Sequence, residues 1–229
     1  MAYFCAEHLA ENFSSVSIDV SFECEKKTMT CIVGPSGSGK STVLRLISGL
    51  DKPGAQQKIF LDEKEITNLP PAKRKIGMVF QSKSLFNHLN VADNVAYGLV
   101  SSGMKKKEAR ARASDFLKDF NLEGFENRFP DTLSGGEAQR VCLARTLITN
   151  PSLVLFDEPL SALDAPLRKK MSSLICDLQK KFSFTGIMVT HDINEAKNLA
   201  DKIILIKKGK ICWHGIPADF REEMLCTSD

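Results

Sequence analysis

The 229-residue sequence has no long hydrophobic run, no marked excess of one charge and no paired cysteine motif. No apolar stretch approaches the roughly 20 residues that a membrane-spanning helix needs, so we expect no transmembrane segment. A formal net charge of +3 is too small to indicate nucleic acid as a partner. Residues 1–5 are soon followed by charged residues and lack the layout of a secretory signal peptide.

The seven cysteines show no C-x-x-C pair and no regular spacing. Most of them stand among apolar residues, which is typical of buried thiols. We interpret them as reduced core residues of a cytosolic protein rather than as disulfide partners or metal ligands. With no internal repeat and an ordinary composition, the length favours one domain that spans residues 1–229.

A glycine-rich loop follows the apolar run 29–33 and precedes a helical pattern of apolar residues. The loop consists of Gly34, Pro35, Ser36, Gly37, Ser38, Gly39, Lys40, Ser41 and Thr42. The order of strand, loop and helix, with the spacing G-x-x-x-x-G-K-S, is typical of a phosphate-binding P-loop. The alternative is an ordinary glycine-rich turn, which the flanking strand and helix disfavour. On its own, the motif indicates only that a nucleoside triphosphate binds.

The chemistry of the loop explains its composition. Glycines let backbone N–H groups turn toward one point, and the helix that starts there adds unpaired N–H groups and the positive end of its dipole. Lys40 has the reach to contact the β- and γ-phosphates, and the hydroxyl of Ser41 is a ligand for Mg²⁺.

Hydrophobic periodicity predicts an α/β fold. Alternating residues at 15–22 indicate a half-buried antiparallel strand, whereas continuous apolar runs indicate strands of a parallel sheet buried on both faces. Further strands are expected at 58–61, 76–80, 153–157, 186–190 and 202–206, and helices at 105–120, 135–149 and 167–181. The pattern predicts a P-loop NTPase core with a mostly parallel sheet (about 1–81 and 151–229). The core would carry an N-terminal antiparallel β subdomain and an inserted α-helical subdomain (about 82–150).

Two acidic residues, Asp157 and Glu158, follow the buried strand 153–157. Ligands gather at the carboxyl ends of strands in open parallel sheets, where a carboxylate can hold Mg²⁺ and a second one can orient an attacking water. The alternative is a surface acidic pair that starts the turn before Pro159. Together with the P-loop, the catalytic interpretation is favoured.

Ser134, Gly135 and Gly136 open the helix 135–149, with Glu137 at the spacing of a capping box. The alternative is a phosphate-binding element, because a helix N-terminus with a serine hydroxyl and two glycines also suits a phosphate. Chemistry alone favours the cap.

The segment 133–139, LSGGEAQ, resembles the signature motif of ATP-binding cassette (ABC) proteins. The order of the motifs also resembles that family: first the P-loop, then Gln81, the signature, Asp157-Glu158, the segment 161–164 and His191. The resemblance covers roughly residues 13–215. In the family two cassettes pair head to tail, and each ATP lies between the P-loop of one copy and the signature of the other.

The resemblance implies roles by position in the P-loop and on the neighbouring strands. Lys40, Ser41 and the backbone of 37–42 would hold the phosphates and Mg²⁺, and Asp157 would hold Mg²⁺ through water. Gln81 would contact Mg²⁺ and the attacking water, while Glu158 would be the general base or the water-positioning group.

Three further roles concern the second ATP and the dimer seam. Ser134, Gly135 and Gly136 would reach the γ-phosphate of the partner's ATP, and Asp164 would lie at the dimer seam. His191 would contact the γ-phosphate and hold Glu158 in place. A capping or core histidine is the alternative for His191, and its place after an apolar strand disfavours that alternative.

An aromatic residue some 25 to 30 positions before the P-loop lysine stacks on adenine in the family. Phe13 fits this place, and Phe4 or plain core packing are the alternatives. The sequence departs from the family pattern at 26–27, where two lysines replace a common Gly-Glu turn, and at Glu137, where glutamine is commoner.

Two classes of cassette remain open: a transport motor, or an ATPase that acts on DNA or ribosomes. The short insertion and the single cassette favour transport, and residues 74–95 resemble importers of small solutes such as spermidine, thiamine, iron, molybdate or sugars. Residues 68–74 and 209–215 resemble the thiamine type most; a lipoprotein-export or cell-division cassette is the alternative.

The implied partners are a second copy of the chain, transmembrane permease subunits and, indirectly, a solute-binding protein, without nucleic acid. The implied location is peripheral, on the cytoplasmic face of the cell membrane. The apolar residues Leu85, Phe86, Leu89 and Val91 would form either a groove for the permease or ordinary core of the helical lobe.

Overall fold

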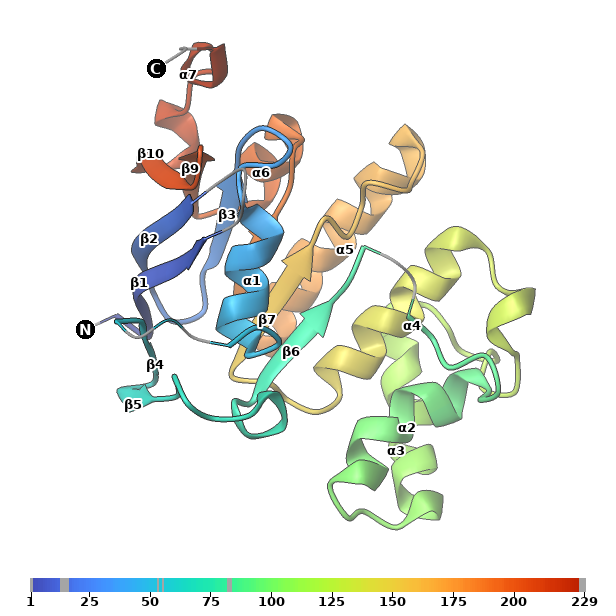
Figure 1. Cartoon of the computed structure of the whole chain (residues 1–229). Helices are drawn as coiled ribbons and strands as arrows, with labels where there is room; N and C mark the ends of the chain where they lie inside the picture. Colours follow the sequence, from blue (N-terminus) through green and yellow to red (C-terminus); the bar gives the residue numbers. More distant parts are fainter. Residues whose placement is uncertain (1, 13–16, 53, 55, 82–83, 227–229) are drawn as a thin grey trace.

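The computed structural model describes residues 2–12, 17–52, 54, 56–81 and 84–226 (Figure 1). The strands are β1 Phe4–Asn12, β2 Ser17–Cys24, β3 Met29–Val33, β4 Lys58–Leu61, β5 Lys64–Glu65, β6 Ile76–Val79, β7 Leu153–Asp157, β8 Thr185–Val189, β9 Lys202–Lys207 and β10 Lys210–Gly215. The helices are α1 Lys40–Ser48, α2 Val91–Ser101, α3 Lys106–Leu117, α4 Gly135–Leu147, α5 Ala165–Phe182, α6 Ile193–Leu199 and α7 Glu223–Cys226. Short 3₁₀ turns connect several of them.

The central element is a six-stranded sheet in the order β10-β9-β3-β8-β7-β6. All its pairs are parallel except β9 with β10, which forms an antiparallel hairpin. The inner strands β3 and β8 are buried along their whole length, as their continuous apolar sequences require. Strand β6 lies at one edge of the sheet and is only partly buried, so the expectation of a buried strand at 76–80 was wrong in that respect.

A second, four-stranded sheet has the order β2-β1-β4-β5, and its strands pair antiparallel. Strand β2 alternates strictly between exposed and buried residues, which confirms the half-buried antiparallel strand expected from its pattern. Together the two sheets and the helices confirm the predicted fold class.

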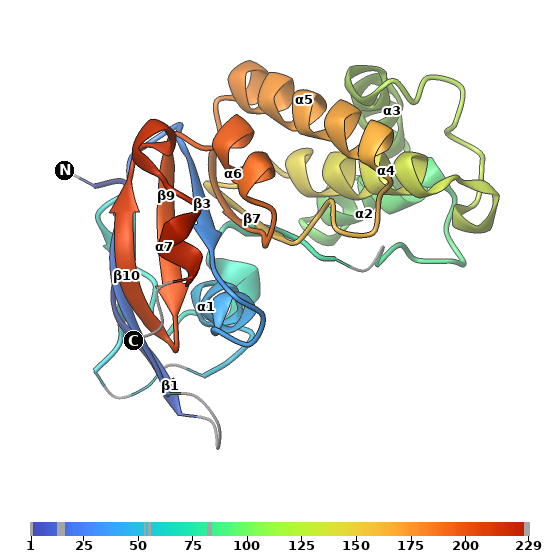
Figure 2. The same ribbon diagram turned by 90° about the horizontal axis from the view of Figure 1, so that it is seen from above.

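Alternate residues of the parallel sheet belong to two different hydrophobic clusters. On one face Ile32, Leu155 and Ile204 pack with apolar residues of α1 and of the antiparallel sheet. On the other face Val33, Phe156 and Leu205 pack with the remaining helices. Helix α1 therefore lies between the two sheets, whereas α2 to α6 cover the opposite face (Figure 2).

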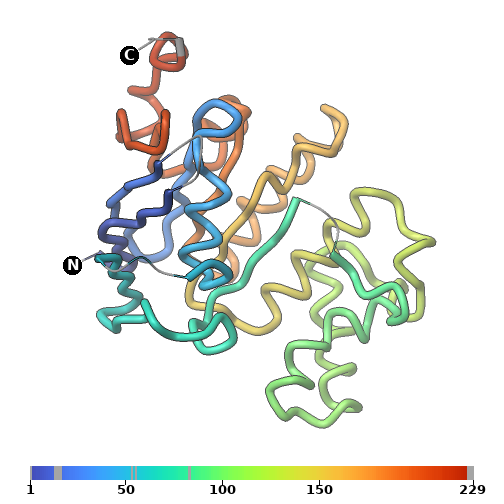
Figure 3. Tube along the Cα trace, in the orientation of Figure 1, coloured from blue at the N-terminus to red at the C-terminus, as the bar shows by residue number. Residues whose placement is uncertain are grey.

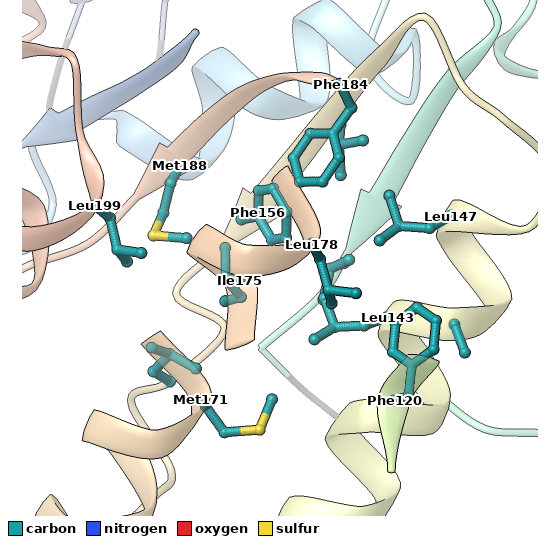
Figure 4. Close-up of a cluster of buried hydrophobic side chains, with 14 of the residues drawn as sticks. Phe120, Leu143, Leu147, Phe156, Met171, Ile175, Leu178, Phe184, Met188 and Leu199 are labelled. Atoms are coloured by element: carbon teal, nitrogen blue, oxygen red, sulfur yellow. The ribbon is translucent and has the colours of Figure 1, made fainter. Parts of the chain in front are cut away.

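The chain leaves the sheet after β6 and returns at β7, its neighbour in the sheet (Figure 3). Among the described residues, α2, α3 and α4 are the α-helices of this excursion, joined by two short 3₁₀ helices. Phe120, Leu143 and Leu147 of this part meet Phe156 of β7 and apolar residues of α5 in one buried cluster (Figure 4). We propose that the division into a core and a helical subdomain near residues 82 and 150 follows this excursion.

Candidate functional site

The order of the strands brings four predicted segments to one edge of the parallel sheet. The neighbouring strands β3, β8, β7 and β6 all run in the same direction. Their carboxyl ends lead into the P-loop, His191, the pair Asp157-Glu158 and Gln81, in that order. The parallel sheet thus collects at one place residues that are up to 157 positions apart in the chain, from Gly34 to His191.

Two glycines of the P-loop occupy positions that no larger residue fits. A Cβ on Gly34 would lie 2.0 Å from the carbonyl oxygen of Ile206, and a Cβ on Gly39 would lie 2.5 Å from the Cδ1 atom of Ile18. Gly39 also has a φ of 98°, in the left-handed region, where it serves as N-cap of α1. The loop is therefore pressed against both sheets.

The N-terminus of α1 suits an anion. No side chain caps its N–H groups, and its first turn contains no acidic residue. The hydroxyl of Ser38 is also buried without a hydrogen-bond partner among the described residues. Unpaired N–H groups at the positive end of a helix dipole, beside a glycine-rich turn, fit the phosphates of a nucleotide.

Lys40 points back over the loop. Its Nζ atom donates hydrogen bonds to the carbonyl oxygens of Gly34 and Pro35, each over 2.9 Å. Burial lowers the pKa of Lys40, while the negative charges of Glu158 and Asp157 act in the opposite direction. The ammonium group is thus held at the mouth of the loop, between the turn and the two carboxylates.

Ser41 and Asp157 meet across the gap between α1 and β7. The hydroxyl of Ser41 donates a hydrogen bond to Oδ1 of Asp157 over 2.8 Å. Burial raises the pKa of Asp157, and the hydrogen bond from Ser41 opposes that effect. Both groups offer oxygen atoms, the ligands that Mg²⁺ prefers.

No three histidine, cysteine or acidic side chains of the described part of the chain gather closely enough to hold a metal alone. Mg²⁺ is usually bound by one or two carboxylates together with the phosphates of a nucleotide and water. The oxygen pair of Ser41 and Asp157 fits that kind of shared coordination.

Glu158 and His191 form a second pair at the ends of β7 and β8. Oε2 of Glu158 lies 3.1 Å from Nδ1 of His191. The Glu158 backbone has a φ of 44° and its N–H donates to the carbonyl oxygen of Val189 over 3.0 Å. A non-glycine residue in this conformation carries strain of about 1–3 kcal/mol, which is a frequent property of active-site residues.

Gln81 reaches this pair through Ser161, to which the sequence assigned no role. Nε2 of Gln81 donates to Oγ of Ser161 over 3.1 Å, and that hydroxyl donates to the backbone carbonyl of Glu158 over 2.9 Å. Only the position of Ser161 at the start of the segment 161–164 could have indicated it. The contact links the edge strand β6 to the carboxylate at the end of β7.

Ser134 caps α4, as its spacing to Glu137 predicts. The Ser134 hydroxyl accepts from the N–H of Glu137, and the Glu137 carboxylate accepts from the N–H of Ser134, which confirms the capping box. Gly136 packs so closely on α5 that a Cβ there would lie 2.8 Å from Cδ1 of Leu167. Asp164 caps α5 by accepting from the N–H of Leu167 over 2.8 Å.

The signature segment does not join the P-loop of its own chain. Helix α4 belongs to the hydrophobic cluster on one face of the parallel sheet and α1 to the cluster on the other. Figures 1 and 2 agree that the two helices lie well apart, so Ser134, Gly135 and Gly136 stand outside the cluster formed by Lys40, Asp157 and His191.

The two candidate adenine platforms have different outcomes. Phe13 lies outside the described residues, so its role stays a prediction. Phe4 is fully buried in the cluster next to α1, where its ring centre lies 5.8 Å from that of Phe22. Phe4 is therefore a core residue, and the alternative that placed it under adenine was wrong.

The apolar residues after Gln81 divide between core and surface. Val91 is buried at the start of α2, whereas Leu85 and Phe86 are only partly covered. The centre of the Phe86 ring lies 4.6 Å from the centre of the half-exposed Tyr97 ring. The guanidinium group of Arg145 lies over the Phe86 ring. Val91 is thus core of the helical lobe, as one alternative of the sequence analysis has it, and the groove for a permease stays a prediction.

The glycine-rich loop between β3 and α1, and the carboxylates on the neighbouring strand, define an α/β protein of the P-loop class. Residues 18–161 match the family model described as ABC transporter. The chain belongs to this family, as the signature and the order of its motifs led us to expect.

Solved structures of this family have the same fold. CbiO1 from Clostridium perfringens, described as part of the ABC transporter complex cbiONQ, matches with a TM-score of 0.85 at 28% identity, over 95% of this chain and 90% of that one. The ATP-binding cassette MJ0796, in a dimeric post-hydrolysis state bound to ADP and Pi, matches with a TM-score of 0.80 at 33% identity, over 95% of this chain and 100% of that one.

Curated relatives carry the name Fe(3+) ions import ATP-binding protein FbpC. The protein from Brucella abortus (strain 2308) is 46% identical over 211 residues, which are 92% of this chain and 59% of the relative. The protein from Escherichia coli (strain K12) is 48% identical over 191 residues, 83% of this chain and 55% of the relative. The chain thus spans little more than half the length of these relatives. None of the described helices is long and apolar enough to span a membrane.

Proposed function

We propose that this chain is the ATP-hydrolysing subunit of an ABC importer, which couples the binding and hydrolysis of MgATP to the uptake of a small solute. The observation that carries the proposal is the convergence of the P-loop, Asp157, Glu158 and His191 at the carboxyl edge of neighbouring parallel strands. Family membership and the names of the relatives support it.

In this proposal each side chain has a defined part. The backbone of 37–42 and Lys40 hold the phosphates, and the oxygens of Ser41 and Asp157, with Gln81, bind Mg²⁺. Glu158 orients the water that attacks the γ-phosphorus, and His191 holds Glu158 and contacts the γ-phosphate. Catalysis is then mainly positioning and charge stabilisation, as is usual for phosphoryl transfer.

Two copies of the chain form the complete site. Helix α1, whose N-terminus offers free N–H groups, and helix α4, which starts after Ser134, pack in clusters on opposite faces of the sheet, so one copy offers two separate half-sites. We propose that a second copy, arranged head to tail, places its Ser134 and Gly136 on the ATP held by the first P-loop, with Asp164 at the seam. The chain alone is then a poor ATPase.

The remaining partners and the location follow from the class of importer. Transmembrane permease subunits would dock at the partly exposed residues after Gln81, where Phe86 and Tyr97 stack, and hold the chain at the cytoplasmic face of the membrane. Among the solutes considered, the names of the relatives favour ferric iron. The thiamine type indicated by 68–74 and 209–215 stays a prediction. A solute-binding protein would act only through the permease.

Glu158→Gln tests the catalytic proposal. The amide keeps the size of the side chain and removes the charge that orients water, so we expect an unchanged ATP Kd and a fall in kcat of at least about a hundredfold. Because uncleaved ATP would stay between the two copies, the variant should also elute as a dimer with ATP in size-exclusion chromatography.

Glu222→Gln, an exposed residue near the C-terminus, is the matched control and should hydrolyse ATP at the normal rate. Full activity of Glu158→Gln would refute the assignment of the site. For the solute, the chain is purified with its membrane subunits and ATPase stimulation is measured with binding protein loaded with ferric iron, thiamine, molybdate or spermidine. If none of these solutes stimulates the ATPase activity, an export, lipoprotein-release or cell-division complex is favoured. If DNA or ribosomes stimulate it, a non-transport ATPase is favoured.

A further inference from the structure

A buried hydrogen-bond cluster lies directly behind His191. Thr190 and Glu195 are almost fully covered, with 2% and 6% of their surface exposed. Oγ1 of Thr190 donates to Oε2 of Glu195 over 2.7 Å. Asp192 caps α6 by accepting from the N–H groups of Asn194 and Glu195, whereas the Glu195 carboxylate turns to Thr190.

The Thr190 hydroxyl also closes a turn around His191. It accepts a hydrogen bond from the N–H of Asp192 over 3.1 Å, so the residues on both sides of His191 are joined through one oxygen atom. The N–H of Thr190 donates to the carbonyl oxygen of Ile32 in β3 over 3.2 Å. The histidine backbone is therefore fixed to the strand that leads into the P-loop.

The His191 side chain itself has little packing to define its position. It is 57% exposed, and its Nδ1 atom lies 3.1 Å from Oε2 of Glu158. The backbone sets the direction of the Cα–Cβ bond and limits the rotamers that such an exposed ring can adopt. The turn built on Thr190 therefore determines whether Nδ1 lies within hydrogen-bond distance of the Glu158 carboxylate.

The same cluster extends to the segment before α5. One terminal guanidinium nitrogen of Arg168 donates to Oδ2 of Asp192 over 3.2 Å. The other terminal nitrogen of Arg168 donates to the carbonyl oxygen of Leu163 over 3.0 Å. Leu163 immediately precedes Asp164, the residue proposed at the dimer seam. The backbone around His191 is thus braced from β3 on one side and from the start of α5 on the other.

Burial makes Glu195 dependent on its donor. Burial raises the pKa of Glu195, and the hydrogen bond from Thr190 opposes that rise. Because burying a carboxylate without a hydrogen bond is costly, loss of the Thr190 hydroxyl would remove a donor on which the Glu195 carboxylate depends.

We propose that Thr190 and Glu195 are positioning residues for His191: the Glu195 carboxylate fixes the Thr190 hydroxyl, which fixes the backbone turn that aims the imidazole at Glu158. This inference rests on the proposed function, in which His191 holds the residue that orients water. It predicts that losing the Thr190 hydroxyl slows hydrolysis through His191 and leaves nucleotide binding to the P-loop intact.

The test compares Thr190→Val, Thr190→Ser and Glu195→Gln in the full chain at a concentration where ATPase activity is measurable. Valine matches threonine in shape and lacks the hydroxyl, so kcat should fall by about ten- to a hundredfold, the loss expected from misplacing a catalytic group by about 1 Å. Serine keeps the hydroxyl and the glutamine amide oxygen still accepts from it, so both variants should stay within about threefold of the original kcat. The Kd of a fluorescent ATP analogue should change in none of them.

Thr185→Val is the matched control. Thr185 opens β8, the strand that Thr190 follows, is equally buried, and its hydroxyl accepts from the N–H of Lys27 over 2.9 Å at the far end of the strand. This variant loses the same group and should keep its kcat. A fall in kcat equal to that of Thr190→Val would overturn the proposal, because general loosening of β8 would then explain both.

A double-mutant cycle separates this inference from the function on which it rests. In the His191→Ala background, Thr190→Val should cause no further loss, because the group that it positions is gone. If the two losses multiply, Thr190 does not act through His191 and the inference is overturned. If His191→Ala itself hydrolyses ATP at the normal rate, the proposed role of His191 fails and the inference falls with it.

Discussion

Arg74 is a buried cation that holds the end of α1 opposite to the P-loop. Only 3% of its surface is exposed, and burial lowers its pKa. One terminal nitrogen donates to the carbonyl oxygens of Leu46 and Ile47, over 2.9 and 2.7 Å, at the C-terminus of this helix. The other guanidinium nitrogens donate to the carbonyl oxygens of Leu69 and Thr67, over 2.8 and 2.6 Å. The chain before β6 is thereby fastened to α1.

Replacement of Arg74 by methionine should destabilise the fold severely. Methionine keeps the apolar stem but removes all four hydrogen bonds to these carbonyl groups, of which, within the described part of the chain, only that of Leu46 keeps a second donor, the N–H of Gly49. At a net value of about 0.5–1.5 kcal/mol for each hydrogen bond, four amount to about 2–6 kcal/mol. Since a domain is stable by only about 5–15 kcal/mol, the change removes a large share of that stability. For a chain of this length it lowers Tm by about 5–20 °C.

Arg45 provides the matched control at the same end of α1. It forms two hydrogen bonds of 2.7 Å with the carboxylate of Asp51, but its side chain is 51% exposed. An exposed ion pair contributes at most about 1 kcal/mol, so Arg45→Met should lower the free energy of unfolding far less than Arg74→Met.

Urea unfolding followed by circular dichroism measures both variants against the original chain. A loss below about 1 kcal/mol for Arg74→Met would refute the reasoning, because the four carbonyls would then find other partners. An equal or larger loss for Arg45→Met would also refute it, since the ion pair and not the buried guanidinium would then hold the helix end.

Two further substitutions have distinct expected outcomes. Because burial raises the pKa of Asp157, its ionised form opposes folding at neutral pH, and Asp157→Asn should raise Tm without nucleotide. Thermal melts should show this gain shrinking as pH falls through the raised pKa, where Asp157 itself becomes neutral; a gain that persists there contradicts the cause. Phe4→Ala should lower stability by about 3–5 kcal/mol and leave the ATP Kd unchanged. A clear rise in that Kd would return Phe4 to the adenine site.

The sequence predicted most directly the strands whose burial follows a simple pattern along the chain. Strands β3, β7 and β8 are almost entirely buried, so their apolar runs identify them directly. Strand β2 has one buried and one exposed face, and its alternation is equally direct. Such segments need no knowledge of their neighbours.

Strand β1 and helix α2 were missed because a local irregularity interrupts their patterns. His8 has a φ of 51°, and the register of β1 against β2 shifts between Ala6 and Leu9, which breaks the alternation of the strand. Helix α2 buries a polar residue, Asn94, whose side chain bonds to the backbone of Phe86 in the preceding loop. A buried amide and an interior glycine hide the apolar face of a helix.

The sequence predicted Lys40, Asp157 and His191 as residues of one site, and the structure brings them together and adds how they are held. Spacing and order identified Lys40, Asp157 and His191, because each follows a recognisable strand. No pattern could predict that Ser161 joins Gln81 to the backbone of Glu158, because that contact depends on where the ends of β6 and β7 come to lie.

The alternation of side chains along β7 has a consequence for how the molecule opens. Leu153 and Leu155 belong to the cluster around α1, while Val154 and Phe156 belong to the cluster under the helices. Opening either cluster would therefore expose one face of β7 to solvent. The amide hydrogens of Val154 and Leu155 should therefore exchange with solvent only when the whole chain unfolds. Those of the exposed β10 hairpin should exchange through local opening, at a far lower free energy.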